Sequence, residues 1–232
     1  GQYAFMGCTA LKSIGSLHNL ETIGKGAFNG CSALEHVDDL YSLTRLESGA
    51  FAHCASLVSV DCSDKLTAIG SSAFFGCKAL VSIGDLSNVT SIESSVFRGC
   101  IALKSIGNMP QLESIGMQCF MGCTALETVG DLSSLKEIPS ETFDGCTSLV
   151  SIGDLSNVTI IGSYGFNQCK KLTSIPNLGS LERVDQFAFS GCESLALLGN
   201  LRKLTSFGNS PFVNSPFHNC PNLVLEVLPD SA

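Results

Sequence analysis

The residues most able to do chemistry are twelve cysteines, and ten of them keep one frame. Nine follow one another at intervals of 23 residues, and the tenth comes 28 residues after the ninth. These ten are Cys8, Cys31, Cys54, Cys77, Cys100, Cys123, Cys146, Cys169, Cys192 and Cys220. Disulfide frameworks are irregularly spaced, and zinc sites use close pairs such as C-x-x-C, which the sequence lacks. We therefore predict a row of buried free thiols that act as small apolar side chains, with no metal and no other cofactor.

Two cysteines lie outside this frame. Cys119 stands directly before Phe120, where other repeats carry a small apolar residue, so we predict that it fills the core. Cys62 stands where other repeats carry Asp or Asn. This position predicts an exposed, reactive thiol at Cys62.

An acidic row keeps the same frame, eight residues after the cysteines. It consists of Asp39, Asp85, Asp131 and Asp154, with Asn108, Asn177 and Asn200 at equivalent places. Stacked carboxylates can collect calcium. However, a single oxygen-bearing side chain per repeat, sometimes an amide, is more typical of a side chain that caps its own turn. Turn capping is the prediction, with calcium as the alternative.

Hydroxyl side chains form another row, five residues after the cysteines. They are Ser13, Ser59, Ser82, Ser105, Thr128, Ser151 and Ser174. No histidine recurs beside them to act as a base, so the row is typical of a sheet surface rather than of nucleophiles. The chain also lacks a G-x-S-x-G elbow and a phosphate-binding loop. We predict that the protein is not an enzyme.

The elements that position these rows repeat with the cysteines. A phenylalanine stands three residues before each of the ten and a leucine three residues after it. Short apolar stretches such as 80–84 and 89–92 predict two brief strands per repeat. The A-F-x-G-C segment predicts a tight helical or 3₁₀ turn. Together they predict a β-rich solenoid of about ten 23-residue coils, forming one domain over residues 1–232.

Composition excludes two classes of partner. No apolar run approaches eighteen residues, which excludes a membrane span. The chain carries 13 basic and 21 acidic residues, a net charge of −8, and its basic residues are scattered. Nucleic acid is therefore not an expected partner.

The pattern L-x-S-I followed by V-T-S-I-G-x-x-A-F-x-G-C resembles the BspA-like, or treponemal-type, leucine-rich-repeat surface proteins. The match extends over nearly the whole chain, although family repeats continue L-x-S-I-x-I-P where this chain has G-D-L, as in Gly84-Asp85-Leu86. The resemblance implies a leucine-rich-repeat solenoid of the α/β horseshoe-like class. It also implies an extracellular or cell-surface location and a non-catalytic scaffold for adhesion or protein–protein recognition, with a protein or cell-surface partner.

Binding is expected at exposed positions that vary between repeats. Such a row lies four residues after the cysteines, beside the first strand: Lys12, Glu35, Val58, Val81, Lys104, Glu127, Val150 and Thr173. Its valines predict a weakly apolar stripe for a protein partner, although strand propensity alone also favours valine there.

An insertion breaks the period near the end of the chain. Its residues Asn209, Pro211, Phe212 and Val213 form a candidate recognition loop, or a bulge that only disrupts the stack. Asn88 and Asn157 lie in N-x-T sequons and are candidate glycosylation sites if the chain passes through a eukaryotic secretory pathway.

The sequence begins and ends within a repeat. Three explanations remain open: a fragment of a longer protein, a processed chain, or a subunit with exposed solenoid ends. In the last case the alternative function is a structural subunit that self-associates head to tail into a fibre or surface layer.

Overall fold

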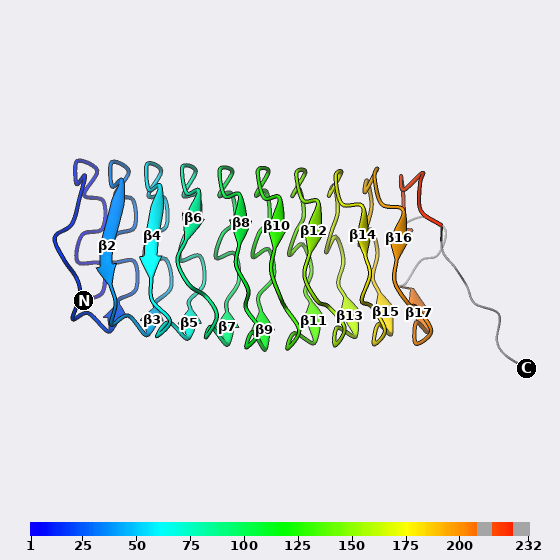
Figure 1. Cartoon of the computed structure of the whole chain (residues 1–232). Helices are drawn as coiled ribbons and strands as arrows, with labels where there is room; N and C mark the ends of the chain where they lie inside the picture. Colours follow the sequence, from blue (N-terminus) through cyan, green and yellow to red (C-terminus); the bar gives the residue numbers. More distant parts are fainter. Residues whose placement is uncertain (208–214, 225–232) are drawn as a thin grey trace, which may run out of the picture.

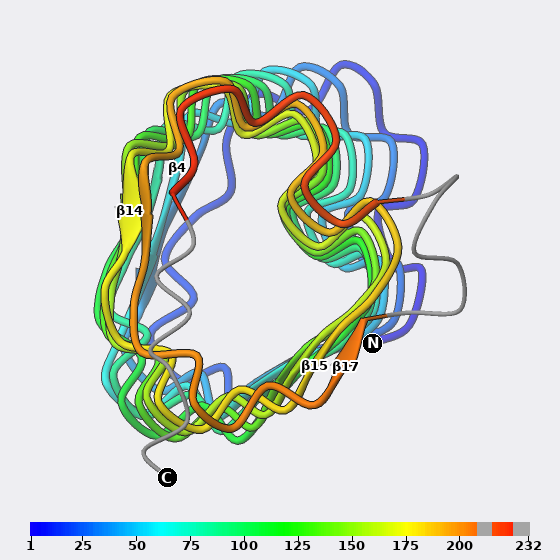
Figure 2. The same cartoon turned by 90° about the vertical axis from the view of Figure 1, so that its right-hand side faces the viewer.

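The chain winds into a straight stack of coils in the computed structural model, which describes residues 1–207 and 215–224 (Figure 1). Each coil contributes short strands to two sides of the stack. Seen along the axis, successive coils superimpose as one closed outline (Figure 2). The predicted β-rich solenoid is therefore confirmed, with two strands per coil.

The first strand of each coil follows the buried leucine. These strands are β2 (His36–Leu40), β4 (Ser59–Cys62), β6 (Ser82–Ile83), β8 (Ser105–Ile106), β10 (Thr128–Val129), β12 (Ser151–Ile152), β14 (Ser174–Ile175) and β16 (Leu197–Leu198). The second strands are β1 (Thr22–Ile23), β3 (Arg45–Leu46), β5 (Ala68–Ile69), β7 (Ser91–Ile92), β9 (Ser114–Ile115), β11 (Glu137–Ile138), β13 (Ile160–Ile161), β15 (Arg183–Val184) and β17 (Ser206–Phe207).

Within each sheet a strand pairs in parallel with the equivalent strand of the next coil, 23 residues on, as Thr22 does with Arg45. The first strands form the sheets β2-β4-β6, β8-β10-β12 and β14-β16, and the second strands form β1-β3-β5-β7-β9 and β11-β13-β15-β17. A shift of exactly one repeat keeps every buried side chain above its equivalent. The register therefore follows from the repeat.

The predicted number of about ten coils is wrong, and about eight turns are formed. Eight first strands are present within the described residues. The repeat that contains Cys8 makes only an isolated bridge there, between Ser13 and His36. The last repeat, which contains Cys220, continues into residues that lie outside the described ranges.

The predicted helical or 3₁₀ turn is also wrong, because the described residues contain strands and turns but no helix. Consecutive hydrogen-bonded turns occur instead, such as Ala27 N–H to Gly24 O and Cys31 N–H to Phe28 O, both 3.1 Å. A left-handed residue interrupts them twice per coil, as at Gly30 with φ 77°. A 3₁₀ helix needs negative φ throughout, so it cannot continue through such a residue. The expected α/β horseshoe-like class is therefore wrong in its helical part.

The turns make a third ladder of hydrogen bonds along the stack. Phe28 N–H donates to Ala50 O and Gly30 N–H to Ala52 O, both at 2.8 Å, one coil further on. Backbone groups thus join neighbouring coils on the turn side as well as through the strands. The turn is fixed by its neighbours rather than by a helix of its own.

The residue seven positions after the ladder cysteine influences the length of the first strand. Asp38 and Asp61 occupy that place in β2 and β4, which have five and four residues. The next coil carries Gly84, and β6 has only two residues. A Cβ on Gly84 would lie 2.5 Å from the Cys62 nitrogen, so glycine is required where this coil approaches its neighbour so closely. The G-D-L departure from the family pattern coincides with these short strands.

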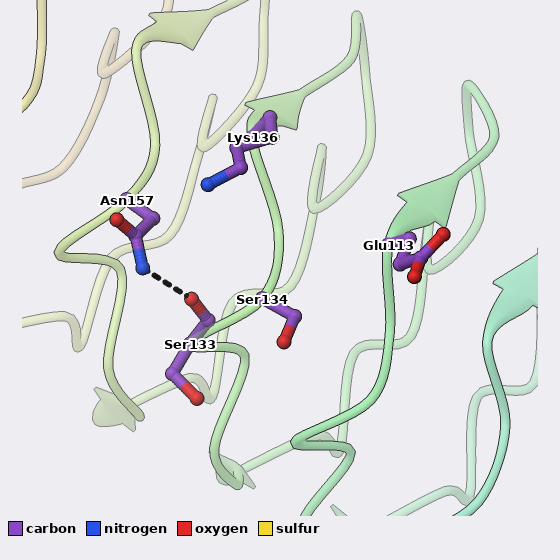
Figure 3. A pocket seen from close by; sticks show the side chains of 5 residues that line it. All are labelled: Glu113, Ser133, Ser134, Lys136 and Asn157. Atoms are coloured by element: carbon purple, nitrogen blue, oxygen red, sulfur yellow. Dashed lines mark hydrogen bonds between the residues drawn. The ribbon is translucent and has the colours of Figure 1, made fainter.

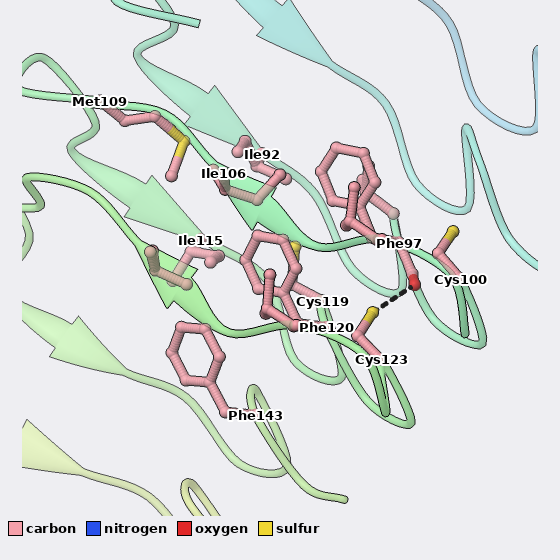
Figure 4. Packing of buried hydrophobic residues seen from close by; sticks show 14 of the residues in the cluster. Ile92, Phe97, Cys100, Ile106, Met109, Ile115, Cys119, Phe120, Cys123 and Phe143 are labelled. Atoms are coloured by element: carbon pink, nitrogen blue, oxygen red, sulfur yellow. Dashed lines mark hydrogen bonds between the residues drawn. The ribbon is translucent and has the colours of Figure 1, made fainter. Parts of the chain in front are cut away.

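The core is a column of identical side chains. Phe28, Phe51, Phe74, Phe97, Phe120, Phe143, Phe166 and Phe189 are all buried. Their rings stack nearly parallel, with centroids of neighbouring rings 5.1 to 5.6 Å apart along the column. Isoleucine, leucine and valine from both strand rows close the column from the other sides, as Ile92, Ile106 and Ile115 do in Figure 4. Each coil therefore buries its apolar surface against its two neighbours.

Candidate functional site

The cysteine row lies inside the stack, next to the phenylalanine column (Figure 4). In each coil the thiol donates a hydrogen bond to the phenylalanine carbonyl one coil earlier, as Cys123 Sγ does to Phe97 O at 3.1 Å. That oxygen already accepts the Cys100 N–H at 3.0 Å. The thiol therefore satisfies the second lone pair of a buried carbonyl. Burial raises the pKa of these thiols, to about 12 for Cys54, which keeps them protonated and unreactive.

The predicted row of buried free thiols is confirmed from Cys31 to Cys192. Cys8 is exposed and Cys220 is partly buried, and all twelve cysteines are free. A hydrogen bond between Cys192 and Cys220 raises the pKa of Cys192 and lowers that of Cys220. The row thus serves packing over most of its length.

Cys62 is buried, so the prediction of an exposed thiol at this position is wrong. The strand register shifts by one residue in this coil and places Cys62 opposite Leu40 rather than opposite Asp39. Cys62 therefore fills the core where neighbouring coils place Leu40 and Leu86, and it is only 8% exposed. Burial, with a contribution from the Asp61 carboxylate, raises its pKa to about 12, which opposes reactivity. Cys119 is fully buried, as predicted.

The predicted turn capping is confirmed for Asp85, Asp131, Asp154 and Asn200 of the acidic row, whereas Asn108 Oδ1 accepts the N–H of Asp131 one coil on. Asp85 Oδ1 accepts the N–H of Ser87 at 2.8 Å, and Asp131 and Asp154 accept the equivalent N–H groups at 2.9 Å. Within residues 1–207 and 215–224, no group of three or more His, Cys, Asp or Glu side chains is placed to hold a metal ion. The observed role of these carboxylates is local and structural.

The strand face is the row that directly precedes the first strands, on the side occupied by β2, β4 and β6 in Figure 1. Of its predicted residues, Lys12, Glu35, Val58, Lys104, Glu127, Val150 and Thr173 are exposed, and Val81 is partly exposed. Backbone bonds such as Val58 N–H to Glu35 O, 2.9 Å, hold the row in line. The structure thus brings these residues together on one surface. The hydroxyl row lies next to the strand face. From Ser59 to Ser174 its residues are the first residues of the first strands, which agrees with the predicted place on a sheet surface.

Two open depressions lie on the other side of the coils. One, of about 400 Å³, is lined by Glu113, Ser133, Ser134, Lys136 and Asn157 (Figure 3). The other, of about 360 Å³, lies around Glu93, whose carboxylate accepts the Ser71 N–H at 2.9 Å and its hydroxyl at 2.7 Å. The two bonds lower the pKa of Glu93. Neither depression is lined by a histidine or a cysteine.

Both sequon asparagines are exposed, but their amide nitrogens are engaged. Asn157 Nδ2 donates to Ser133 O at 2.8 Å, as Figure 3 shows, and Asn88 Nδ2 donates to Asp64 O at 2.8 Å. A glycan attaches through this nitrogen, so glycosylation would alter a bond between coils. Glycosylation at these sites stays a prediction.

A further surface, absent from the sequence predictions, lies on the turns. We call it the turn face; it consists of Phe75, Arg98, Met117, Gln118, Glu141, Asp144, Tyr164 and Phe187. Several of these side chains contact a member in the next coil. Arg98 Nη1 donates to Gln118 Oε1, and Gln118 Nε2 donates to Glu141 Oε2, both at 2.8 Å. The Arg98 guanidinium also lies 5.8 Å from the centroid of the Phe75 ring.

The second half of the turn face is aromatic and acidic. The rings of Tyr164 and Phe187 stack with centroids 5.1 Å apart. Asp144 Oδ1 accepts a hydrogen bond from Asn167 Nδ2 at 2.7 Å. Partial burial raises the pKa of Asp144. The turn face therefore combines aromatic rings, one cation and two carboxylates in a fixed order along the stack.

The sequence did carry a signal for the turn face. Five residues before the ladder cysteine, the residue is Tyr3 in the first repeat, Gly26 and Gly49 in the next two, and Tyr164 and Phe187 in two late repeats. Such variation at one repeat position marks a surface where coils differ.

The candidate recognition loop of Asn209, Pro211, Phe212 and Val213 lies outside the described residues. At the first coil the Phe5 ring is 44% exposed, whereas Phe28 one coil later is 4% exposed.

Within the described part of the chain, no helix is long and apolar enough to cross a membrane. The family described as a BspA type leucine rich repeat region matches residues 1–127 and 113–223, in six copies. No curated protein matches the sequence.

Several solved structures are similar. A leucine rich repeat protein from T. pallidum is 27% identical with a TM-score of 0.54, and the match covers 82% of this chain and 76% of that one. A leucine rich cell surface protein from Faecalibacterium prausnitzii is 22% identical with a TM-score of 0.53, covering 90% and 76%. A leucine-rich repeat protein from Eubacterium ventriosum is 17% identical with a TM-score of 0.64, covering 100% and 82%.

Proposed function

Because the chain belongs to the BspA-type leucine-rich repeat family, we propose that it is a non-catalytic scaffold for adhesion or protein–protein recognition, outside the cell or on its surface. Repeat proteins of this kind typically bind other proteins over an extended face. The observation that carries the proposal is a contrast within each coil. The core residues Phe and Cys are the same in every repeat, while the strand face changes from Lys12 to Val58 to Glu127.

One finding supports the location. The similar protein from Faecalibacterium prausnitzii is described as a cell surface protein. Protease treatment of intact source cells tests the location: the chain should be cleaved without cell lysis, and complete protection would contradict a surface location.

The strand face is the proposed binding surface. Val58 and Val150 are 38% and 43% exposed, so they offer apolar contact area on this face. The test is panning of a phage-displayed random peptide library against the intact chain. Selected peptides should lose at least about tenfold in affinity, or about 1.4 kcal/mol, when Val58→Glu and Val150→Glu are combined.

The matched control combines Ser114→Glu and Ile160→Glu in the second-strand row and should leave the peptide affinity unchanged. Both double variants should melt within a few degrees of the parent chain. Selected peptides that bind equally well to the strand-face variant would show that the ligand face lies elsewhere.

Head-to-tail assembly through the ends of the stack stays a second prediction. If it occurs, light scattering should detect species well above 24.3 kDa. Phe5→Glu or Leu223→Glu should then abolish them, because a charge would be buried between coils. Assembly that survives either charge would contradict a joint through the ends.

A further inference from the structure

We propose that the turn face pairs side by side with the turn face of a second copy of this chain, around a two-fold axis that passes close to Gln118. This inference is independent of the strand-face proposal, because it uses another surface and another partner. Its three supports are backbone conformation, the order of charges and rings, and residue type.

The backbone support is the left-handed conformation of Gln118, Glu141, Tyr164 and Phe187, with φ between 56° and 60°. Large side chains are disfavoured there because the Cβ crowds the following carbonyl, whereas glycine is not. Gly26 and Gly49 make the same turn in earlier coils, so the turn itself does not need the large side chains. Strain of this kind is concentrated at sites of interaction.

The order of charges supports the choice of partner. Along the stack Arg98 lies one coil before Gln118, and Glu141 and Asp144 lie one coil after it. A two-fold axis through Gln118 exchanges the two directions along the stack. Arg98 of each copy then meets the carboxylates of Glu141 and Asp144 in the other, which is the reciprocal contact that an isologous interface requires.

The order of aromatic rings agrees with the same axis. Phe75 lies two coils before Gln118, and Tyr164 lies two coils after it. At three coils the axis exchanges His53 with Phe187. The His53 and Phe75 rings already contact each other edge to face at 5.1 Å, as the Tyr164 and Phe187 rings do by stacking. Each copy therefore presents two preformed aromatic pairs that face the pairs of its partner.

The charged groups have capacity left for a partner. Arg98 contacts Gln118 and Phe75. It takes part in none of the ion pairs among the described residues, which are Arg45–Glu47, Lys170–Glu193 and Arg183–Asp185. Partial burial raises the pKa of Asp144, as expected for a carboxylate without a cation nearby. Arg98 uses one of its five N–H donors within the chain.

The residue types also fit an interface. Aromatic residues, methionine and arginine are enriched where proteins meet, and Met117, next to the axis, is 51% exposed. The face is narrow, however. With neighbouring rings 5.1 to 5.6 Å apart, its six coils extend for about 27 Å along the stack. The turn face is only one turn wide, so a contact of this length buries less than the roughly 800 Å² per partner of a standard interface. We therefore expect a weak dimer.

The test is sedimentation of the intact chain over roughly 1 to 500 μM, in about 0.15 M salt so that the net charge of −8 is screened. The parent chain should shift from monomer to dimer. Arg98→Glu alone and Asp144→Arg alone should each weaken the dimer at least about tenfold, since each sets like charges against each other at both contacts.

An equimolar mixture of the two variants should restore the dimer, because in the mixed pair both contacts join opposite charges. Both variants should melt as the parent does, which separates loss of contact from loss of fold. A parent chain that stays monomeric throughout, single variants that dimerise normally, or a mixture that does not recover would each overturn the proposal.

A cross-link gives a second reading. A side chain on a two-fold axis lies close to its own copy, so Gln118→Cys in a Cys8→Ser background should be joined to itself by a short bis-maleimide. Lys104→Cys on the strand face is the matched control and should not be joined. Equal cross-linking at both positions would overturn the axis, and dimers lost with Phe5→Glu but not with Arg98→Glu would assign association to the ends.

Discussion

Each coil passes through two left-handed residues, and the sequence treats the two places in opposite ways. One residue before the ladder cysteine the left-handed residue is usually glycine: Gly7, Gly30, Gly76, Gly99, Gly122, Gly145 and Gly191. Five residues before it, glycine remains only at Gly26 and Gly49. The demand on the backbone is similar, so the difference lies in the side chain. The first place is chosen for conformation and the second for what it presents to solvent.

The same contrast separates the two sides of the turn. The buried side carries the phenylalanine column and the thiol row, which hold coil to coil. The exposed side carries the turn face, whose members differ in every coil. Changes on the buried side should therefore cost stability, whereas changes on the exposed side should cost association.

The largest expected effect is on the buried side: raising the pH should lower the free energy of unfolding, because the buried thiols ionise. Burial raises the pKa of the core thiols, to about 12 at Cys54 and Cys62, above the ordinary value of about 8.5. Their contribution is complete below the unfolded pKa and is lost as the pH rises toward the folded pKa, at about 1.4 kcal/mol per pH unit for each thiol. We expect cooperative, reversible unfolding above about pH 10 in circular dichroism.

The control is the double variant Cys62→Val and Cys119→Ala, which removes two of the buried thiols. It should move the alkaline midpoint upward. An unchanged midpoint would mean that other groups cause the transition.

Truncating one side chain of the phenylalanine column should have the next largest effect on the free energy of unfolding. Phe120 is fully buried between Phe97 and Phe143, with ring centroids 5.2 and 5.3 Å away. Phe120→Ala should lower the free energy of unfolding by about 3 to 5 kcal/mol in urea titration. Met117→Ala, on the exposed side of the same coil, should change it by less than about 0.5 kcal/mol. A similar loss for the two variants would remove the distinction between the sides.

The smallest effects sharpen the comparison of the two left-handed places. A Cβ on Gly122 would meet no atom within 4 Å. Gly122→Ala therefore tests conformation alone and should cost about 1 kcal/mol. Ser95→Gly, at the other place with φ 60°, should be neutral or stabilising by a few tenths of a kcal/mol. A neutral Gly122→Ala in thermal melts would show that the glycines are kept for another reason.

The repeat made much of the fold predictable. A period of 23 residues repeats every position, so the two brief strands per repeat and the buried thiol row could be predicted from the sequence. The capping role of Asp85 followed from residue type. These features depend on identity at one repeat position, which the sequence displays ten times over.

The failures share a physical cause. The A-F-x-G-C segment was expected to form a helical turn. The left-handed place five residues before the cysteine is seldom glycine, so the sequence carries no signal of positive φ there. Cys62 was expected to be exposed because counting cannot show that a strand register has shifted by one residue. The turn face was missed because its contacts join residues from different coils, such as Arg98 and Gln118. Contacts of that kind need the stack before they can be seen.

The free cysteines have a mechanical consequence. Since no disulfide joins one coil to the next, a pulling force on the chain can strip coils from an end one at a time. Each coil adds only the 5.1 to 5.6 Å ring spacing to the length of the stack, but its 23 residues stretch to about 80 Å once released. Under a pulling force the solenoid would therefore lengthen in repeated steps, and each released coil would absorb part of the applied work.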